Sequence, residues 1–278
     1  MRIGFVTCVA LGRACIERIY EVGGHLDALF TLQDGIAVHK AGRVFLDDIA
    51  RDSKAPLTKF RHINDEDALD AMRRAQLDWL LVIGWSQIAN HQVLSIPRNG
   101  VLGMHPTLLP EGRGRASIPW AILKGLPQTG VTLFQLDEGV DTGPIAAQEV
   151  LPIAPDETAT TLYSRVQAAH VALIARAWPD ITSGGLTLTP QGAGATEWPA
   201  RSPGDGQLRN DMTIAQMDRL VRAVTHPYPG AFVDRRDGSR LRVWGGRTEP
   251  GENRSESFPI EAKDGVFWAV DFEIESEA

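Results

Sequence analysis

The chain has 278 residues and a formal net charge of −7, with 43% hydrophobic and 23% charged residues. This is the composition of a globular protein, and its length favours one large domain followed by a smaller one. The acidic balance argues against extended binding to nucleic acid. The first residues enter a strand pattern directly, and no apolar run reaches the length of a membrane span. We therefore expect a cytoplasmic protein with no signal peptide.

The N-terminal part predicts alternating strands and helices. Residues 2–8 predict a buried strand, a helix opens at Gly12, and residues 25–32 predict a second strand. This order indicates a right-handed βαβ unit in a parallel sheet. The first turn lacks the G-x-G-x-x-G pattern, so a dinucleotide site is not expected. The two cysteines, Cys8 and Cys15, form neither a metal motif nor a disulfide framework, and we expect no metal site.

The next segment predicts two strands that end in polar or turn-forming residues. After a predicted helix at 65–76, the continuous apolar run Trp79–Gly84 is typical of a central parallel strand. Residues 101–104 predict another strand, and His105 follows it directly. Ligands of open α/β sheets gather at the carboxyl ends of the strands. If the two strands are neighbours, the imidazole lies where a catalytic or ligand-binding group is expected.

The remaining elements complete two domains. A strand at 129–135 and a strand at 145–151 predict a hairpin whose tip is D-E-G-V-D-T-G-P-I, and a long helix then runs to Gly184. Further elements are expected as helices at 118–124 and 213–224, strands at 231–234, 240–244 and 265–272, and a frayed tail from Glu273. The sequence thus predicts an α/β fold with a Rossmann-like parallel-sheet domain and a small, mainly β C-terminal domain. The expected boundaries are 1–185, a connector at 186–212, and 213–278.

Three polar features converge in this pattern: His105 after a strand, Asp141 in a glycine-rich turn, and the turn at Ser86–Gln87. A histidine paired with a carboxylate can accept a proton from an attacking amine and donate to a developing oxyanion. The alternative is that His105 merely ends a strand and that Asp141 makes an Asx-turn.

Three blocks of the sequence resemble the folate-dependent formyltransferase family. They read H-P-T-L-L-P-E-G-R-G-R-A, P-W-A-I-L-K-G and T-G-V-T-L-F-Q-L-D-E-G-V-D-T-G-P-I. The resemblance covers most of residues 1–185 and continues through T-E-W-P-A-R-S-P-G-D-G and residues 219–232. The family includes methionyl-tRNA formyltransferases, glycinamide ribonucleotide transformylases and sugar N-formyltransferases.

The resemblance implies a function for each block. His105 and Asp141 match the family's catalytic residues, and N10-formyltetrahydrofolate is implied as the co-substrate that donates the formyl group. Binding of the pterin is implied for two loops, at Trp85, Ser86, Gln87 and Ile88, and at Asp137, Glu138, Gly139, Val140 and Asp141. On the acceptor side of the cleft we expect Thr107, Arg113, Gly114 and Arg115, since arginine suits phosphate and carboxylate groups.

One position departs from the family pattern. Members usually carry an asparagine two residues before the histidine, where its amide donates to the formyl oxygen, but here the residue is Gly103. Loss of such a donor typically costs about two to three orders of magnitude in rate. We expect a protonated His105 to carry more of the oxyanion stabilisation, and Gln87, with Ser86, is the nearest candidate for a replacement donor.

The chain resembles the sugar N-formyltransferases most within this family. This resemblance implies that the acceptor is the amino group of a nucleotide-linked amino-dideoxysugar, and it also suggests a homodimer. The acidic chain and its short C-terminal part disfavour a tRNA acceptor. Three alternatives stay open: another amine, including methionyl-tRNA; a formyltetrahydrofolate hydrolase; and, because of Gly103, a protein that binds folate or a nucleotide without catalysis.

Overall fold

The computed structural model describes residues 1–36, 38, 42–249 and 257–276, which form two compact units. Unit 1 comprises residues 1–113, 130–150 and 166–197, and unit 2 comprises residues 114–129, 151–165 and 198–278. The chain therefore passes between the units several times. The domain boundaries expected at residues 185 and 212 divide it into continuous segments instead, and they stay a prediction.

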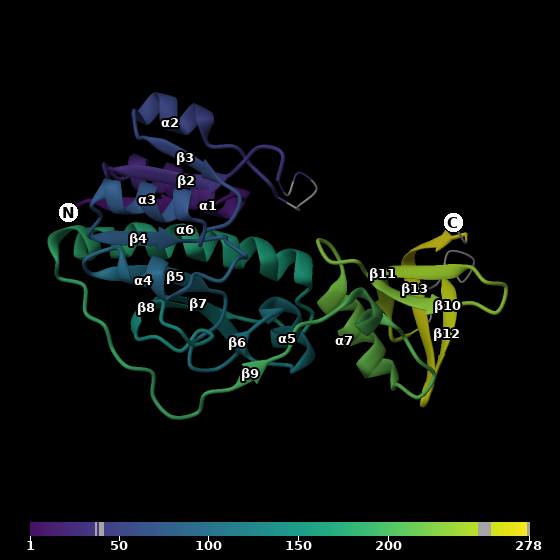
Figure 1. Cartoon of the computed structure of the whole chain (residues 1–278). Helices are drawn as coiled ribbons and strands as arrows, with labels where there is room; N and C mark the ends of the chain where they lie inside the picture. The colour runs from purple at the N-terminus through teal and green to yellow at the C-terminus, as the bar shows by residue number, and fades with distance from the viewer. Residues whose placement is uncertain (37, 39–41, 250–256, 277–278) are drawn as a thin grey trace. The chain divides into compact units, whose positions relative to one another are not determined.

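Figure 1 labels the helices and strands in chain order. From the N-terminus to the end of the long helix they are β1 (Ile3–Val6), α1 (Ala10–Glu21), β2 (Ala28–Leu32), α2 (Asp47–Ser53), β3 (Leu57–Phe60), α3 (Glu66–Ala75), β4 (Trp79–Val82), α4 (His91–Ser95), β5 (Gly100–His105), β6 (Arg113–Gly114), α5 (Ser117–Leu123), β7 (Gln128–Gln135), β8 (Ile145–Pro152) and α6 (Ala159–Ser183). Within the described residues, no helix is both long and apolar enough to cross a bilayer.

Seven of the eight described strands of this part, all but β6, form one sheet in the order β3-β2-β1-β4-β5-β7-β8. Strands β1 to β5 pair in parallel, and β7 runs antiparallel to β5. The predicted α/β fold with a largely parallel sheet is thus confirmed. β4 and β5 are neighbours, with Val82 opposite Gly103, so the two strand ends singled out in the sequence share one edge of the sheet.

Both faces of the central strands are covered by helices. β1, β2 and β4 are buried along their whole length, as expected of parallel strands with helices on each side. On one face, Leu69 and Met72 of α3 pack against Phe30 and Leu80. α1 and α6 lie beside each other, since a shallow apolar groove is lined by residues of both.

Helix α1 begins at Ala10, two residues before the predicted start at Gly12. Gly12 lies inside the helix, and a Cβ there would come within 1.9 Å of the hydroxyl oxygen of Thr7, the residue that follows β1. The glycine therefore allows a close approach between α1 and β1 rather than opening the helix. The pattern also missed several short elements, among them α2, β3, α4 and the C-terminal strand β12 (Phe258–Ala262).

Unit 2 contains a four-stranded antiparallel sheet in the order β10-β11-β13-β12. Its remaining elements are β9 (Glu197–Trp198, whose first residue belongs to unit 1), the 3₁₀ helix η1 (Pro203–Gly206), α7 (Ile214–Val224), β10 (Ala231–Asp234), β11 (Arg240–Arg247) and β13 (Gly265–Glu275). Thr213 caps α7 through a capping box with Gln216. This small β sheet was predicted.

The prediction of a frayed tail is wrong as far as Glu275. β13 continues to that residue, and the Glu275 carboxylate accepts two hydrogen bonds from the Arg242 guanidinium, at 2.7 and 2.8 Å. Paired Arg–carboxylate bonds of this kind fix geometry as well as adding energy, so the strand end is held to β11. The last two residues of the predicted tail, 277 and 278, lie outside the described part.

Candidate active site

His105 is the last residue of β5 and lies at the carboxyl edge of the sheet in unit 1. The imidazole is buried, with 9% of its side-chain surface exposed. Its Nε2 lies 2.8 Å from the Gly112 carbonyl oxygen, and its Nδ1 lies 3.4 Å from Asp141 Oδ2. The structure therefore brings together the imidazole and the carboxylate on which the sequence hypothesis depends.

Both ring nitrogens of His105 face oxygen atoms that accept hydrogen bonds. Nε2 faces a carbonyl oxygen, which can only accept, and Nδ1 faces a carboxylate oxygen. A neutral imidazole carries one proton and satisfies one of these contacts, whereas the imidazolium donates to both. The pair is thus arranged to hold a proton and to pass it to a neighbouring substrate atom.

Asp141 reaches His105 from a tight loop between β7 and β8. The residue adopts a left-handed backbone conformation with φ +53°, and its side chain is half-buried. Asp137 folds the loop, because its Oδ1 accepts hydrogen bonds from the Gly139 amide at 3.1 Å and the Thr142 hydroxyl at 2.6 Å. A Cβ at Gly139 would lie 2.0 Å from that hydroxyl oxygen, so the glycine is required for this turn.

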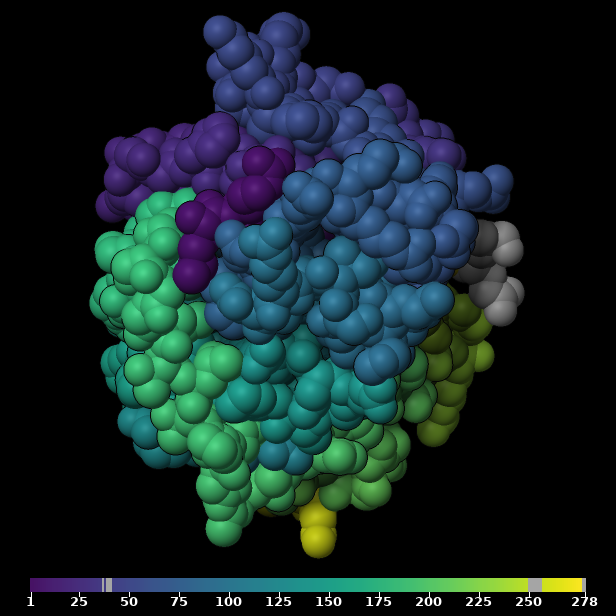
Figure 2. All heavy atoms as spheres, turned by 60° about the vertical axis from the view of Figure 1, so that its left-hand side comes forward, coloured from purple at the N-terminus to yellow at the C-terminus, as the bar shows by residue number. Residues whose placement is uncertain are grey.

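An extended segment after α6 makes hydrogen bonds to the residues around His105 and Asp141. Residues 184–197, green in Figure 2, run along the surface of unit 1. Gln191 in this segment donates from Nε2 to the carbonyl oxygens of Asp141 and Gly143, both at 2.8 Å. Its Oε1 accepts from the Arg113 guanidinium at 2.6 and 3.1 Å. Gln191 therefore ties the aspartate loop to the strand segment that follows His105.

Thr196 holds the carbonyl that contacts His105. Its hydroxyl accepts from the Gly112 amide at 2.9 Å, and its carbonyl accepts from the Arg113 amide at 2.9 Å. The sequence predicted only a connector at residues 186–212, and the contacts of Gln191 and Thr196 were not expected. A cluster of polar residues in an otherwise aperiodic stretch was the sole available signal.

The second predicted pterin loop, residues 85–88, follows β4 and is anchored by side chains. Both ends of the Gln87 amide are engaged, because Oε1 accepts from the Ile63 amide at 2.9 Å and Nε2 donates to the Arg61 carbonyl at 3.0 Å. Asn64 donates to the Ile88 carbonyl at 2.9 Å. An oxyanion contact from Gln87 would require one of these bonds to be exchanged.

The other residues of the two loops divide into packed and exposed groups. Trp85 packs edge-on against Phe60, with ring centroids 5.8 Å apart. Ile88 and Val140 are 81% and 59% exposed, which is unusual for side chains of this size. Glu138 forms an exposed ion pair with His91 at 3.1 Å, and such pairs contribute little to stability. Both loops therefore present apolar side chains on rigid backbones.

Gly103 has no room for a side chain in this structure. A Cβ at this position would lie 2.6 Å from Leu136 Cδ2. Gly103 and His105 point to the same face of β5, since alternate residues of a strand share a face. The isobutyl group of Leu136 therefore occupies the space beside the imidazole where a side chain at position 103 would extend.

The predicted acceptor residues fall into two groups. Thr107 and Arg113 belong to unit 1, and the buried Thr107 hydroxyl has no hydrogen-bond partner in the described part of the chain. Gly114 and Arg115 belong to unit 2, where the Arg115 amide donates to the Trp198 carbonyl at 3.1 Å. A buried hydroxyl without a hydrogen-bond partner in the described residues is a group that a ligand can satisfy.

A second histidine, His170 of α6, is buried within electrostatic range of His105. Burial lowers the pKa of His170 to about 4, although its hydrogen bond to the Val166 carbonyl opposes this and the charge of His105 adds to it. Its Nδ1 donates to that carbonyl at 2.7 Å. His170 is therefore neutral at pH 7 and does not compete with His105 for a proton.

The buried neutral His170 predicts an acid-dependent loss of stability. An unfolded histidine titrates near pH 6.5, so below that pH the unfolded chain binds a proton that the folded chain excludes. We expect about 3 kcal/mol of unfolding free energy to be lost between pH 6.5 and about pH 4 at this residue. Urea unfolding of the parent and His170→Gln should show the difference between them shrink by that amount. An equal change with the exposed His91→Gln would contradict this assignment.

Two family models match the chain. The model described as formyl transferase matches residues 28–178, and the model described as formyl transferase, C-terminal domain, matches residues 201–271. The first alone covers more than half of the chain.

Solved structures with the same fold include two formyltransferases and the protein HypX. An N-formyltransferase from Helicobacter canadensis, in complex with folinic acid and dTDP-3-aminofucose, is 17% identical with a TM-score of 0.74, covering 97% of this chain and 98% of that chain. Methionyl-tRNA formyltransferase from Clostridium thermocellum is 17% identical with a TM-score of 0.63, and all of both chains is covered. HypX from Aquifex aeolicus is 18% identical with a TM-score of 0.66, and this chain spans 44% of its length.

The first family model spans both His105 and Asp141. Taken with the geometry at His105 and Asp141, the matches establish that the chain is a member of the formyl transferase family.

Proposed function

We propose that the protein transfers a formyl group from N10-formyltetrahydrofolate to the amino group of a nucleotide-linked amino-dideoxysugar. The observation that carries the reaction type is the His105–Asp141 pair, with Nδ1 and Oδ2 3.4 Å apart at the carboxyl edge of the sheet. A formyl transfer from nitrogen to nitrogen needs a donor for the oxygen of the formyl group and a group that takes the amine proton. In this pair a protonated imidazole can donate to the formyl oxygen, and the Asp141 carboxylate can take the amine proton.

The two loops fit a reduced pterin. Ile88 and Val140 offer exposed apolar side chains that a flat ring can cover. The loop backbones are held by Gln87, Asn64 and Asp137, so their amides and carbonyls are fixed in place for hydrogen bonding. The bound folate would bring the transferable one-carbon group; the chain itself orients it and excludes water.

His105 takes the main part in charge stabilisation in this proposal. Gly103 supplies no side-chain donor, and Leu136 fills the space that such a donor would need. The apolar surface of Leu136 lowers the local polarity beside the ring, and electrostatic interactions strengthen when water is excluded. An imidazolium held by Asp141 at Nδ1 can donate from Nε2 to the developing negative charge, in exchange for its contact with the Gly112 carbonyl.

The packing at Gly103 makes a prediction about stability. Gly103→Asn alone should destabilise the fold by about 1–3 kcal/mol, because the new Cβ overlaps Leu136. Combining it with Leu136→Ala should relieve the overlap, giving a favourable coupling of at least about 1 kcal/mol in a double-mutant cycle measured by urea unfolding. Additive effects of the two changes would show that Leu136 is not what excludes a side chain at this position.

The acceptor class rests on two considerations. The Helicobacter canadensis enzyme carries dTDP-3-aminofucose in its complex and aligns over nearly the whole of both chains. The net charge of −7 is unfavourable for a tRNA acceptor, whose phosphates are best met by a basic surface. The cytoplasmic location and the homodimer stay predictions.

A screen of acceptors tests the proposal. The purified chain is incubated with N10-formyltetrahydrofolate and, separately, with dTDP-, UDP- and GDP-linked amino sugars, with methionyl-tRNA and with no acceptor. We expect one amino sugar to gain the mass of a single formyl group. Formylated methionyl-tRNA would overturn the acceptor assignment, free formate without any acceptor would indicate a hydrolase, and no turnover in any arm would indicate a binding protein.

A further inference from the structure

Unit 2 contains a small cavity that the formyl-transfer site does not use. Its volume is about 130 Å³, and its walls are mainly apolar. The lining includes Pro119, Arg201, Ser202, Val224, Tyr228 and Pro229. A dry cavity of about 150 Å³ is known to admit benzene, so this one accommodates a group of roughly the size of a single ring.

The cation that lines the cavity, Arg201, makes no direct ion pair within the described residues. Arg201 Nη2 donates to the backbone carbonyl of Asp205 at 2.8 Å, and its guanidinium carbon lies 5.0 Å from the centroid of the Trp120 ring. The Asp205 carboxylate is instead bound by the backbone amide and hydroxyl of Ser202, at 2.6 and 3.0 Å. Within the described residues, Arg201 makes no ion pair.

The electrostatic surroundings of Arg201 favour an added anion. Burial lowers the pKa of Arg201, and the charge of Asp205 only partly offsets this. Lys124 also lies over Trp120, at 5.7 Å from the ring centroid, and it too has no ion pair in the part of the chain that the structure describes. A guanidinium has five N–H donors, and among the described residues only one of those of Arg201 has a hydrogen-bond acceptor.

The part of the lining formed by Gly206 and residues 228–230 is held in place by close packing and hydrogen bonds. A Cβ at Gly206 would lie 2.8 Å from the Gly230 carbonyl oxygen, so the two backbones approach as closely as glycine allows. Arg242 donates to the Pro229 carbonyl at 2.6 Å, and His226 stacks on Trp244 with ring centroids 3.9 Å apart. The segment that carries Tyr228 and Pro229 is thus fixed from behind, and the cavity is preformed rather than opened by a ligand.

We propose that this cavity is a binding site for a small organic anion, in which a ring-sized apolar body fills the cavity and a carboxylate or phosphate group pairs with Arg201. Arginine recognises both groups through its planar fork. The apolar walls contribute through burial of the ring. The site is independent of formyl transfer, because no residue of the catalytic pair takes part in it.

Binding of benzoate, phenyl phosphate and the neutral analogue benzamide to the full chain tests this site. The titrations are followed by ligand-observed NMR at low ionic strength, without formyl donor. At least one of the anions should bind, and benzamide should bind at least 10-fold more weakly. Arg201→Gln should weaken the anion about 10–100-fold, as expected for a hydrogen-bonded charge. Arg201→Lys, which keeps the charge but not the fork, should lie between the two.

The matched control is Arg209→Gln, because Arg209 is an exposed arginine of the same unit, paired with Asp211. It should leave binding unchanged, and circular dichroism should show that the variants remain folded. Preference for benzoate or for phenyl phosphate identifies the anionic group, and either supports the site. Failure of both to bind, equal binding of benzamide, or an Arg201→Gln variant that binds like the parent would overturn the proposal. None of these results depends on whether the chain transfers formyl groups.

Discussion

His105→Asn is expected to lower the rate of formyl transfer about 10²–10⁴-fold while leaving the fold intact. This is the usual contribution of a positioned acid–base group. Asparagine carries no titratable proton, so it cannot carry positive charge beside the formyl oxygen. The rate is measured as kcat/KM by mass spectrometry of the product, and circular dichroism checks the fold.

The companion change at the carboxylate decides whether the two side chains act as a unit. In the present structure Asp141 Oδ2 lies 3.4 Å from His105 Nδ1. Asp141→Asn keeps a neutral oxygen near this place and removes the charge that stabilises the imidazolium. We expect a loss of about 10²-fold or more, and the double variant should be hardly slower than His105→Asn alone. Full additivity of the two losses would show that Asp141 acts elsewhere. His91→Asn, at an exposed ring, is the matched control and should be silent.

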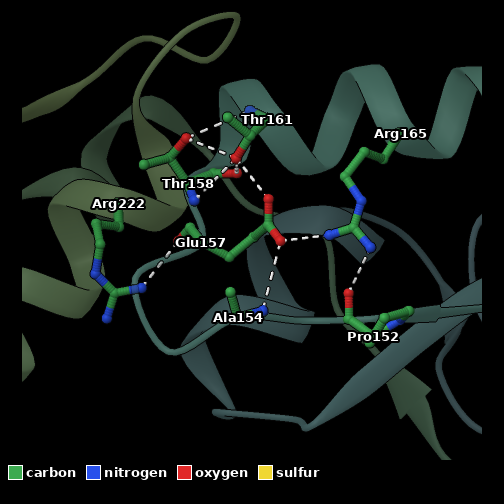
Figure 3. A network of polar contacts seen from close by, with 7 residues as sticks. All are labelled: Pro152, Ala154, Glu157, Thr158, Thr161, Arg165 and Arg222. Atoms are coloured by element: carbon green, nitrogen blue, oxygen red, sulfur yellow. Dashed lines mark hydrogen bonds and ion pairs between the residues drawn. The ribbon is translucent and has the colours of Figure 1, made fainter.

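Arg165→Met is expected to destabilise unit 2 by about 3 kcal/mol. Figure 3 shows the network around Glu157, whose side chain is 6% exposed. Arg165 Nη1 binds one carboxylate oxygen at 2.5 Å, and the Thr161 hydroxyl donates to the other at 2.6 Å. Removing one partner of a buried ion pair leaves an uncompensated charge, which typically costs about 3–5 kcal/mol. Water access to the partly exposed Arg165 places this case at the lower end.

The effect should be localised, because the same network ties three elements together. Arg165 also donates to the Pro152 carbonyl at the end of β8, and Arg222 of α7 donates to the Glu157 carbonyl at 2.9 Å. Hydrogen exchange should therefore accelerate most at the first turn of α6. Urea unfolding measures the global cost, for which Arg209→Met is the exposed control, expected to change stability by less than about 1 kcal/mol.

Removing both charges separates the ion pair from the packing. The variant with Glu157→Met and Arg165→Met should be more stable than Arg165→Met alone, because no buried charge is then left unpaired. If the double variant were less stable than the single one, the network would be contributing through its hydrogen bonds rather than through charge compensation.

The sequence predicted the parts of the site that follow from strand ends. A continuous apolar run before Gly84 and a second strand before His105 were enough to place both at one edge of a parallel sheet, and β4 and β5 are neighbours. The hairpin that carries Asp141 was also predictable, since two alternating strands flank a glycine-rich turn. These inferences depend only on hydrophobic periodicity and on the order of strands and helices, both of which can be recognised in short stretches of the sequence.

The supporting contacts could not be predicted in this way. Gln191 and Thr196 reach Asp141 and Gly112 across separations of 50 and 84 residues. They come from an extended segment with no hydrophobic period, so nothing in their immediate neighbours indicates a partner. The filling of the Gly103 position by Leu136 is likewise a packing relation, between β5 and the residue that follows β7, which a single sequence does not encode by spacing.

The N-terminal part of the predicted connector, residues 186–197, also shows that tertiary contacts cannot be predicted from local sequence. Its composition, rich in glycine, proline and threonine, correctly indicated irregular backbone. The pattern gave no sign that this backbone would hold the loop of the catalytic aspartate, because irregular segments acquire their roles from tertiary contacts. Polar side chains in such stretches are therefore worth testing first: Gln191→Ala is the natural probe of how far Arg113 and the Asp141 loop depend on one another.

The fate of a labelled formyl group tests the central claim most directly. The parent chain and His105→Asn are each mixed with an excess of N10-formyltetrahydrofolate carrying a ¹³C formyl carbon and with the amino sugar found in the screen, and the reaction is stopped within one turnover. The label should appear on the sugar nitrogen with the parent chain and remain on the folate with His105→Asn. Label transferred equally fast by both chains would contradict the assignment of His105, and label recovered only as formate would contradict transfer itself.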